Sequence, residues 1–224
     1  MAKLIAFDCD GVLRDESESY TRCIAETVAF FNNGIHATTE ELTESMKGSN
    51  DDWERTHKIL QQRGIFLDFE MIKEHFQDLY LGEKRNFSGY INNEPWLVDN
   101  TLLDRLAKSY KLVIVSGAPL EEVRYTLRRN NAEGYFQYVW GMFDCDGKKD
   151  GLEKAFAKFQ PSEIFFCDDR PSPIKQAVAV PFVRAYGILP PVYNKDWKKI
   201  LLDSGAEKVF DNVNNYCKFL LELK

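Results

Sequence analysis

Apolar residues along this chain form two kinds of pattern, continuous runs and helical spacing. In several places they form short continuous runs that end in acidic residues, Ser or Gly. Runs of this kind are typical of strands that are buried on both faces. The pattern predicts strands over residues 3–7, 111–116, 135–141, 163–169 and 181–186.

Helical spacing separates these runs after residue 96. Apolar residues three or four positions apart predict a helix between successive strands and a terminal amphipathic helix over 213–223. Strand and helix therefore alternate, and the N-terminal run supplies one further strand. This alternation is typical of a parallel sheet with helices on both faces. We expect an α/β fold whose core is a Rossmann-like parallel sheet.

A segment with helical spacing and few strand signals interrupts the alternation directly after the first strand. It covers residues 17–95, with a helix start expected at Asp51 and helix ends at Gly34 and Gly64. The segment is too long for a single crossover connection. We therefore expect a core domain of residues 1–15 and 96–224, with residues 16–95 inserted as a helical subdomain.

The composition of the chain argues against two kinds of binding partner, nucleic acids and membranes. The chain has 224 residues, 44% of them hydrophobic, and a formal net charge of −6. This balance, without a dense basic stripe, argues against a nucleic-acid partner. No apolar run approaches membrane-spanning length, and the N-terminal run is too short for a signal peptide, so we expect no membrane partner. Five scattered cysteines without a CxxC pair fit reduced thiols in a cytoplasmic protein.

Polar residues follow three of the predicted strands. Because ligands bind outside the carboxyl ends of an open parallel sheet, we expect these residues to converge in one crevice. Neighbouring carboxylates repel one another unless a cation neutralises them, and oxygen ligands in a loose cluster suit Mg²⁺. Lys148 or Lys149 could handle an anionic substrate. The converging residues are Asp8 and Asp10 after the first strand, Ser116 and Gly117 after the second, and Asp168 and Asp169 at the fourth.

The letters DCDG occur twice, at 8–11 and at 144–147. The first run directly follows a buried strand, and Gly11 allows the chain to turn there. The second run follows Phe143 and has the character of a surface loop. We expect the first run to carry chemistry and the second to deliver Lys148 to the crevice.

Four motifs in order resemble the haloacid dehalogenase-like (HAD) superfamily. They are FDCDGVLRD, VIVSG, DGKKDGL and FFCDD, and they span residue 4 to about residue 180. The helical insert resembles the cap of phosphoglycolate phosphatase-like and β-phosphoglucomutase-like members. The resemblance implies an Mg²⁺-dependent phosphatase that hydrolyses a small phosphorylated metabolite. We expect a monomer or homodimer. A phosphomutase and a binding protein that has lost catalysis are the alternatives.

The resemblance also implies a role for each matching residue. Asp10 at the second acidic position favours phosphate chemistry over dehalogenation. Arg14, where the insert begins, could reach a substrate or lie in solvent. The implied roles are Asp8 as nucleophile, Asp10 as general acid and then base, Ser116 and Gly117 as phosphoryl contacts, Lys148 as the neutralising lysine with Lys149 as the other candidate, and Asp8, Asp10, Asp168 and Asp169 as the Mg²⁺ site.

One departure from the family pattern concerns the fourth motif. The family motif usually ends in a further Asp, but Pro173 stands there in FFCDDRPSPI, or Ser172 if the count starts at Asp168. Asp168 could replace the lost carboxylate. Otherwise the resemblance implies weaker Mg²⁺ binding or lost catalysis.

Overall fold

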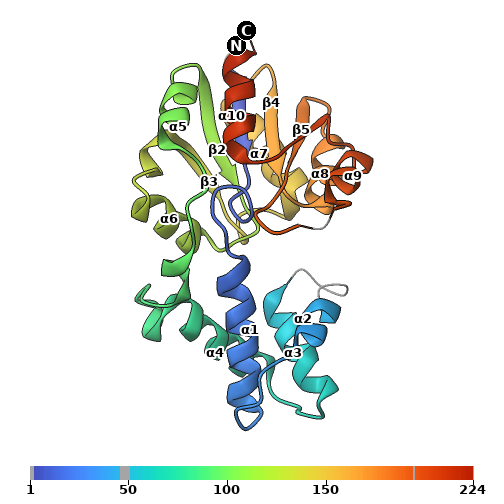
Figure 1. Cartoon of the computed structure of the whole chain (residues 1–224). Coiled ribbons are helices and arrows are strands. Elements are labelled where there is room, and N and C mark those ends of the chain that lie inside the picture. Colours follow the sequence, from blue (N-terminus) through green and yellow to red (C-terminus); the bar gives the residue numbers. More distant parts are fainter. Residues whose placement is uncertain (1–2, 46–50, 194, 224) are drawn as a thin grey trace. The chain divides into compact units, whose positions relative to one another are not determined.

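The computed structural model describes residues 3–45, 51–193 and 195–223 (Figure 1). Contacts divide the chain into two compact units, one of Met1–Asp15 with Pro95–Lys224 and one of Glu16–Glu94. The second boundary of the helical segment therefore lies one residue before the position expected from the sequence.

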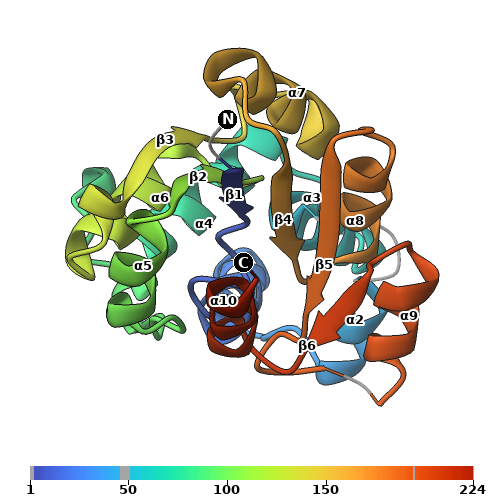
Figure 2. The ribbon, with the colours of Figure 1, turned by 90° about the horizontal axis from the view of Figure 1, so that it is seen from above.

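The first unit contains a six-stranded sheet in which every neighbouring pair of strands is parallel (Figure 2). The order is β3-β2-β1-β4-β5-β6, which is that of a doubly wound Rossmann sheet. This confirms the predicted α/β fold. The strands are β1 Lys3–Phe7, β2 Tyr110–Val115, β3 Phe136–Trp140, β4 Ile164–Asp168, β5 Val183–Ile188 and β6 Lys208–Phe210.

Helices cover both faces of this sheet (Figure 2). Successive residues of a strand point to opposite faces, so Ile5 and Phe7 enter one core cluster while Leu4 and Ala6 enter the other. Burial on both faces is the reason that these strands are continuous apolar runs. The first cluster lies under α5 Asn100–Ala107, α6 Leu120–Arg129 and α10 Val213–Glu222, and the second under α7 Gly147–Phe159, α8 Pro171–Val178 and α9 Trp197–Asp203.

Two elements of this unit were missed by the sequence-based prediction. The short helix α9 and the three-residue edge strand β6 both follow β5. β6 pairs in register with β5 through Tyr186–Lys208 and Ile188–Phe210. Elements this short contain too few apolar positions to establish a period.

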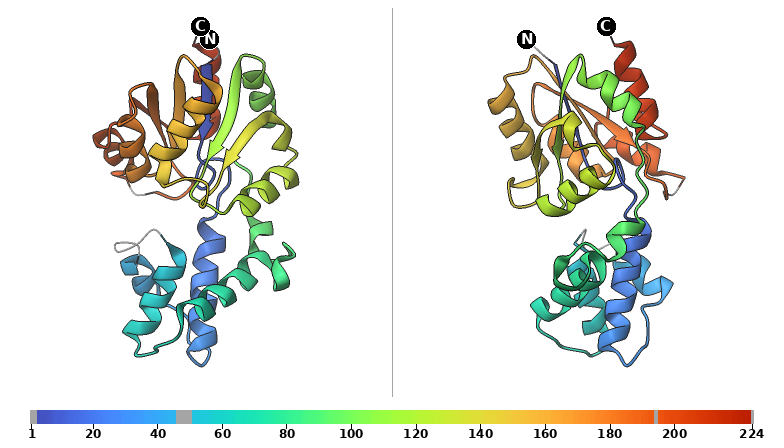
Figure 3. Two further views of the ribbon diagram at one scale, coloured as in Figure 1. Left: turned by 180° about the vertical axis from the view of Figure 1, so that it is seen from behind. Right: turned by 90° about the vertical axis from the view of Figure 1, so that its left-hand side faces the viewer.

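The described residues of the second unit form helices and no strand. α1 packs against α3 and α4, and α3 packs against both α2 and α4 (Figure 3). The carboxylates of Asp51 and Asp68 cap the first turns of α3 and α4. The helices are α1 Ser17–Phe31, α2 Thr39–Ser45, α3 Asp52–Gln62 and α4 Phe69–Leu81, with 3-10 turns at Glu83–Arg85 and Tyr90–Asn93.

A search of the described helices for a bilayer-spanning segment, one both long and apolar enough, gives no candidate.

A tyrosine hydroxyl buried in the first unit gives a test of the packing. Tyr216 of α10 is fully buried, and its hydroxyl has no hydrogen-bond partner among the described residues. Because burying an unpaired hydroxyl is costly, Tyr216→Phe should raise the free energy of unfolding by about 1 kcal/mol. Urea denaturation measures this change.

Tyr110 provides the matched control. Its hydroxyl lies under the same helix and donates a hydrogen bond to the carbonyl of Leu220 at 3.0 Å. Tyr110→Phe should therefore lower the free energy of unfolding by about 1 kcal/mol. Equal losses in the two variants would contradict this account of the core.

Candidate active site

Three aspartates form a buried carboxylate cluster at the carboxyl edge of the sheet. β1 and β4 are neighbours in register, with Phe7 opposite Cys167, so Asp8 and Asp168 lie side by side. Asp8, Asp168 and Asp169 are 6%, 0% and 4% exposed. Each offers a carboxylate oxygen, and these oxygens lie within 4.8 Å of one another.

Lys148 places its ammonium group inside this carboxylate cluster. Its Nζ lies 2.5 Å from Oδ1 of Asp8 and 3.1 Å from Oδ2 of Asp168. It also donates a hydrogen bond to the carbonyl of Val115 at 2.7 Å. A single amine therefore connects the ends of β1, β2 and β4.

Lys149 does not join the carboxylate cluster. Its side chain is exposed, and its Nζ lies 3.9 Å from Oε1 of Glu153 on the same helix. Neighbouring residues of a helix point about 100° apart, so α7 can direct only one of the two lysines inward. The structure thus places Lys149 away from the position expected for a substrate contact.

The N-terminus of α7 fixes the direction of Lys148. Gly147 has a φ of +77°, and a Cβ at this position would lie 2.5 Å from Oε1 of Gln176. That same oxygen accepts a hydrogen bond from the backbone N–H of Lys148 at 2.8 Å. Gln176 of α8 therefore positions the lysine. The sequence analysis missed it because no local motif marks a contact between residues so far apart in the chain.

Burial and charge perturb both partners of the central ion pair. Burial raises the pKa of Asp8 well above its usual value, and the neighbouring carboxylate of Asp168 adds to this, while Lys148 opposes it. Burial disfavours the charged amine, but Asp168 and Asp8 outweigh burial and hold the pKa of Lys148 above its usual range. Lys148 contacts two of the three carboxylates, and Nε of Arg170 lies 3.9 Å from Oδ2 of the third, Asp169. The oxygen donors of the three carboxylates fit a hard divalent cation such as Mg²⁺.

Two segments distant in the sequence contact Asp169. Gly11, with a φ of +69°, approaches it so closely that an added Cβ would overlap its carboxylate. Nε1 of Trp197 donates a hydrogen bond to the backbone carbonyl of Asp169 at 2.9 Å. Trp197 begins α9, a helix that the sequence analysis missed, so this contact could not be anticipated.

Ser116 and Gly117 follow β2 at the same edge of the sheet. Ser116 is buried, its N–H donates to the carbonyl of Trp140 at 2.9 Å, and its Oγ accepts from the N–H of Ala118 at 3.0 Å. A Cβ added at Gly117 would meet no described atom within 4 Å. The backbone at Gly117 therefore has open space beside a fixed serine.

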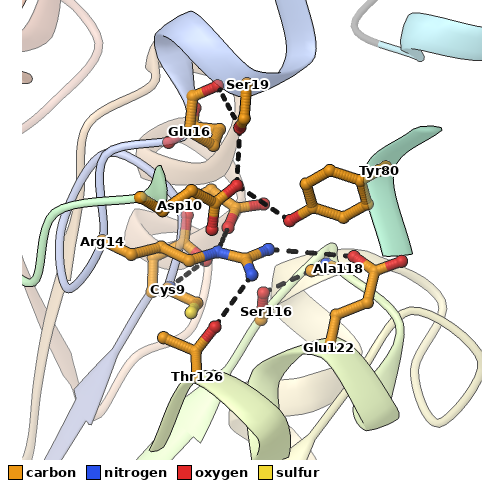
Figure 4. A network of polar contacts seen from close by, with 12 residues as sticks. Cys9, Asp10, Arg14, Glu16, Ser19, Tyr80, Ser116, Ala118, Glu122 and Thr126 are labelled. Atoms are coloured by element: carbon orange, nitrogen blue, oxygen red, sulfur yellow. Dashed lines mark hydrogen bonds and ion pairs between the residues drawn. The ribbon is translucent and has the colours of Figure 1, made fainter. Parts of the chain in front are cut away.

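The sequence analysis expected Arg14 to reach a substrate or to lie in solvent, and the structure contradicts the solvent-exposed alternative. Arg14 is fully buried, and its Nε lies 2.6 Å from Oδ1 of Asp10 (Figure 4). The cause is local. The N–H groups of Leu13 and Arg14 both donate to the carbonyl of Cys9, and Gly11 donates to Arg14, so the chain folds back on itself.

The second DCDG run lies outside the carboxylate cluster. Asp144 is exposed, and its Oδ2 accepts a hydrogen bond from the N–H of Gly141 at 2.8 Å. Asp146 is exposed directly before α7. The run is the surface loop from which Lys148 enters the cluster.

The altered end of the fourth motif lies in the first turn of α8. That helix begins at Pro171, so Pro173 occupies a position where a proline costs no helical hydrogen bond. Pro173 offers no carboxylate. Asp168 contributes one instead, and its Oδ1 also accepts a hydrogen bond from the N–H of Arg170 at 2.9 Å.

Comparison with known families bears directly on these residues. A family model described as haloacid dehalogenase-like hydrolase matches residues 5–182. The chain belongs to this family. The matched region contains all four motifs and the helical insert, and it confirms the resemblance drawn from the sequence.

Solved structures of HAD-like proteins share the fold over nearly the whole chain. A provisionally named β-phosphoglucomutase from Thermotoga maritima has a TM-score of 0.78 at 18% identity and covers 100% of both chains. A predicted phosphoglycolate phosphatase from Haemophilus somnus 129PT has a TM-score of 0.79 at 21% identity and covers 98% of each chain.

A curated relative is longer than this chain. An imidazoleglycerol-phosphate dehydratase from Phytophthora nicotianae is 27% identical over 152 residues, which are 64% of this chain. The match spans 33% of that protein. The chain therefore corresponds to about a third of that relative. The name of that relative refers to the full-length protein.

The two adjacent lysines give a stability test of the carboxylate cluster. Lys148→Met removes the ammonium partner of the buried carboxylates of Asp8 and Asp168, so the free energy of unfolding should fall by about 3 kcal/mol. Lys149→Met removes only an exposed charge and should change it by less than about 0.5 kcal/mol. Urea denaturation at pH 7 in EDTA makes the comparison. Similar losses in both variants would contradict the assignment of Lys148 to the cluster.

Proposed function

We propose that this protein is an Mg²⁺-dependent phosphatase that hydrolyses the phosphate monoester of a small metabolite through an aspartyl-phosphate. The observation that carries the proposal is the buried ion pair of Asp8 and Lys148 beside two further carboxylates. A carboxylate repels a phosphate dianion until positive charge screens both groups. Lys148 is placed to supply part of that charge.

In the first step, a carboxylate oxygen of Asp8 attacks the phosphorus atom of the ester. A new bond forms between this oxygen and phosphorus, and the bond from phosphorus to the leaving oxygen breaks. The electron pair of that bond stays on the leaving oxygen, which takes a proton from the carboxyl group of Asp10. Lys148, Ser116 and the backbone at Gly117 bind the phosphoryl oxygens and hold them in line for the attack.

In the second step, Asp10 acts as a base. Its carboxylate accepts a proton from a water molecule whose oxygen attacks the phosphorus. The bond between Asp8 and phosphorus breaks, its electron pair returns to the Asp8 carboxylate, and inorganic phosphate leaves. The enzyme is restored with a proton on Asp10.

The residues suited to hold Mg²⁺ are Asp8, Asp168 and Asp169, together with the backbone carbonyl of Asp10. When bound, the ion neutralises the charge on the transferring phosphoryl group. The second unit, Glu16–Glu94, is proposed to serve as the family's helical cap, which selects a small substrate.

Two alternatives have specific support. The name of the Thermotoga maritima structure favours a phosphomutase, which would return the phosphoryl group to a sugar. Pro173 in place of an acid favours a binding protein that has lost turnover. Isomerised sugar phosphate without free phosphate would identify the first, and thermal stabilisation by a phosphate ester without hydrolysis would identify the second.

The two DCDG runs give a matched test of catalysis. Asp8→Asn should lower the rate of phosphate release from an aryl phosphate at least a thousandfold, roughly, because the nucleophile is lost. Asp144→Asn keeps an oxygen that can accept the hydrogen bond from Gly141, so it should retain wild-type activity. Phosphate release with and without Mg²⁺ is the measurement. Full activity in Asp8→Asn would contradict the proposal.

The metal site can be tested without turnover. Mg²⁺ should raise the melting temperature of the wild type, because it binds only the folded carboxylate cluster. Asp169→Asn should abolish most of this rise, whereas Asp146→Asn, a change in the exposed second run, should leave it intact. Scanning calorimetry across a range of Mg²⁺ concentrations makes the comparison. An undiminished rise in Asp169→Asn would place the ion elsewhere.

A further inference from the structure

A fully buried guanidinium group contacts the proposed general acid. Nε of Arg14 lies 2.6 Å from Oδ1 of Asp10, and Nη1 donates a hydrogen bond to Oγ1 of Thr126 at 3.0 Å. Nη2 lies 3.8 Å from Oε2 of Glu122 (Figure 4). The side chain of Arg14 is 0% exposed and that of Glu122 only 2%. The planar group therefore joins the loop after β1 to the helix α6.

Helix α6 is a rigid support for this contact. Glu122 and Thr126 are four residues apart, so they lie on the same face of the helix. Between them and beyond them, Val123 and Leu127 are fully buried in the core under that face of the sheet. Helix α6, which packs into the core, therefore holds the guanidinium group of Arg14 in place. The guanidinium group in turn fixes the position of Asp10.

A gain in folding stability does not by itself explain this buried network of charged side chains. Taking charges out of water is costly, and replacing a buried ion pair by apolar side chains is often neutral or stabilising. What a planar guanidinium supplies is geometry, because its donors have fixed directions. Asp10 needs geometry, since its side chain lies in a loop and is 24% exposed.

The contacts also distinguish the two oxygens of Asp10. Oδ1 accepts from Arg14, whereas among the described residues no hydrogen bond reaches Oδ2. An oxygen that accepts from a guanidinium carries no proton of its own. The proton that Asp10 exchanges with a substrate therefore belongs on Oδ2.

We propose that Arg14 is a positioning residue for catalysis: Thr126 and Glu122 anchor its guanidinium group, which holds Oδ1 of Asp10 so that Oδ2 faces the leaving group. The proposal rests on the phosphatase function proposed above. When the ester bond breaks, the proton on Oδ2 passes to the leaving oxygen, and the electron pair of that bond remains there as a lone pair of the alcohol. Arg14 itself touches neither substrate nor phosphorus.

This role predicts an effect that depends on the leaving group. An alkyl phosphate releases a strongly basic alkoxide and needs the proton from Asp10. A 2,4-dinitrophenyl phosphate releases a stable phenolate and does not. In Arg14→Met, kcat/KM should fall at least tenfold further, roughly, for the alkyl ester than for the dinitrophenyl ester, within the contribution expected of general acid catalysis.

Three further variants separate positioning from folding. Asp10→Asn should show the same selectivity, and adding Arg14→Met to it should cost little more, because both changes remove one function. Arg14→Lys keeps the positive charge but lacks the planar guanidinium group. It should restore only part of the kcat/KM that Arg14→Met loses for the alkyl ester. Arg184→Met, which breaks an ion pair between Arg184 on β5 and Glu207, should lower kcat/KM equally for both esters, if at all.

The outcomes are distinguishable. A wild type that hydrolyses neither ester would overturn the proposed function and this inference with it. A wild type that hydrolyses both, with equal losses in Arg14→Met or additive losses with Asp10→Asn, would overturn this inference alone. If Arg14→Met does not fold, Thr126→Val removes one hydrogen-bond partner of the arginine. The ratio of kcat/KM for the alkyl ester to that for the dinitrophenyl ester should then fall by at least about twofold, the effect of a modest hydrogen bond. An unchanged ratio there would count against the proposal.

Discussion

The structure depends on one buried ammonium group, that of Lys148, which pairs with the buried carboxylates of Asp8 and Asp168. Lys148 draws together the ends of β1, β2 and β4, and it does so only because α7 begins at Gly147 with a backbone that Gln176 holds. The parallel pairing of β1 with β4 brings Asp8 beside Asp168. The fold and the site are therefore consequences of the same pairing.

The perturbed pKa of Asp8 is consistent with the function proposed above. Burial and the neighbouring carboxylate raise the pKa of Asp8, so the ionised form needs further positive charge. Structural ion pairs usually match their charges, whereas functional sites keep groups with perturbed pKa values. In the function proposed above, a bound divalent cation would supply that charge. Arg14 plays a separate role, since its charge is taken up by Asp10 and Glu122 on the other side of the loop.

Much of the fold and part of the site could be predicted from the sequence. The first five strands were predicted because burial on both faces makes them continuous apolar runs, and the ends of parallel strands must meet at one edge. The choice between Lys148 and Lys149 required the rotational phase of α7, which depends on where that helix starts. Gln176 and Trp197 act through contacts that join distant parts of the chain. The burial of Arg14 follows from a reverse turn within the first motif, and no periodicity indicates such a turn.

The central claim is that Asp8 becomes covalently phosphorylated within the carboxylate cluster. The most direct measurement is to trap that intermediate with sodium borohydride during turnover in the presence of Mg²⁺ and to sequence the peptides by mass spectrometry. Borohydride reduces an aspartyl-phosphate to homoserine. The account predicts homoserine at position 8 that appears only with substrate. Sustained hydrolysis that leaves Asp8 unreduced, or reduction at another aspartate, would contradict it.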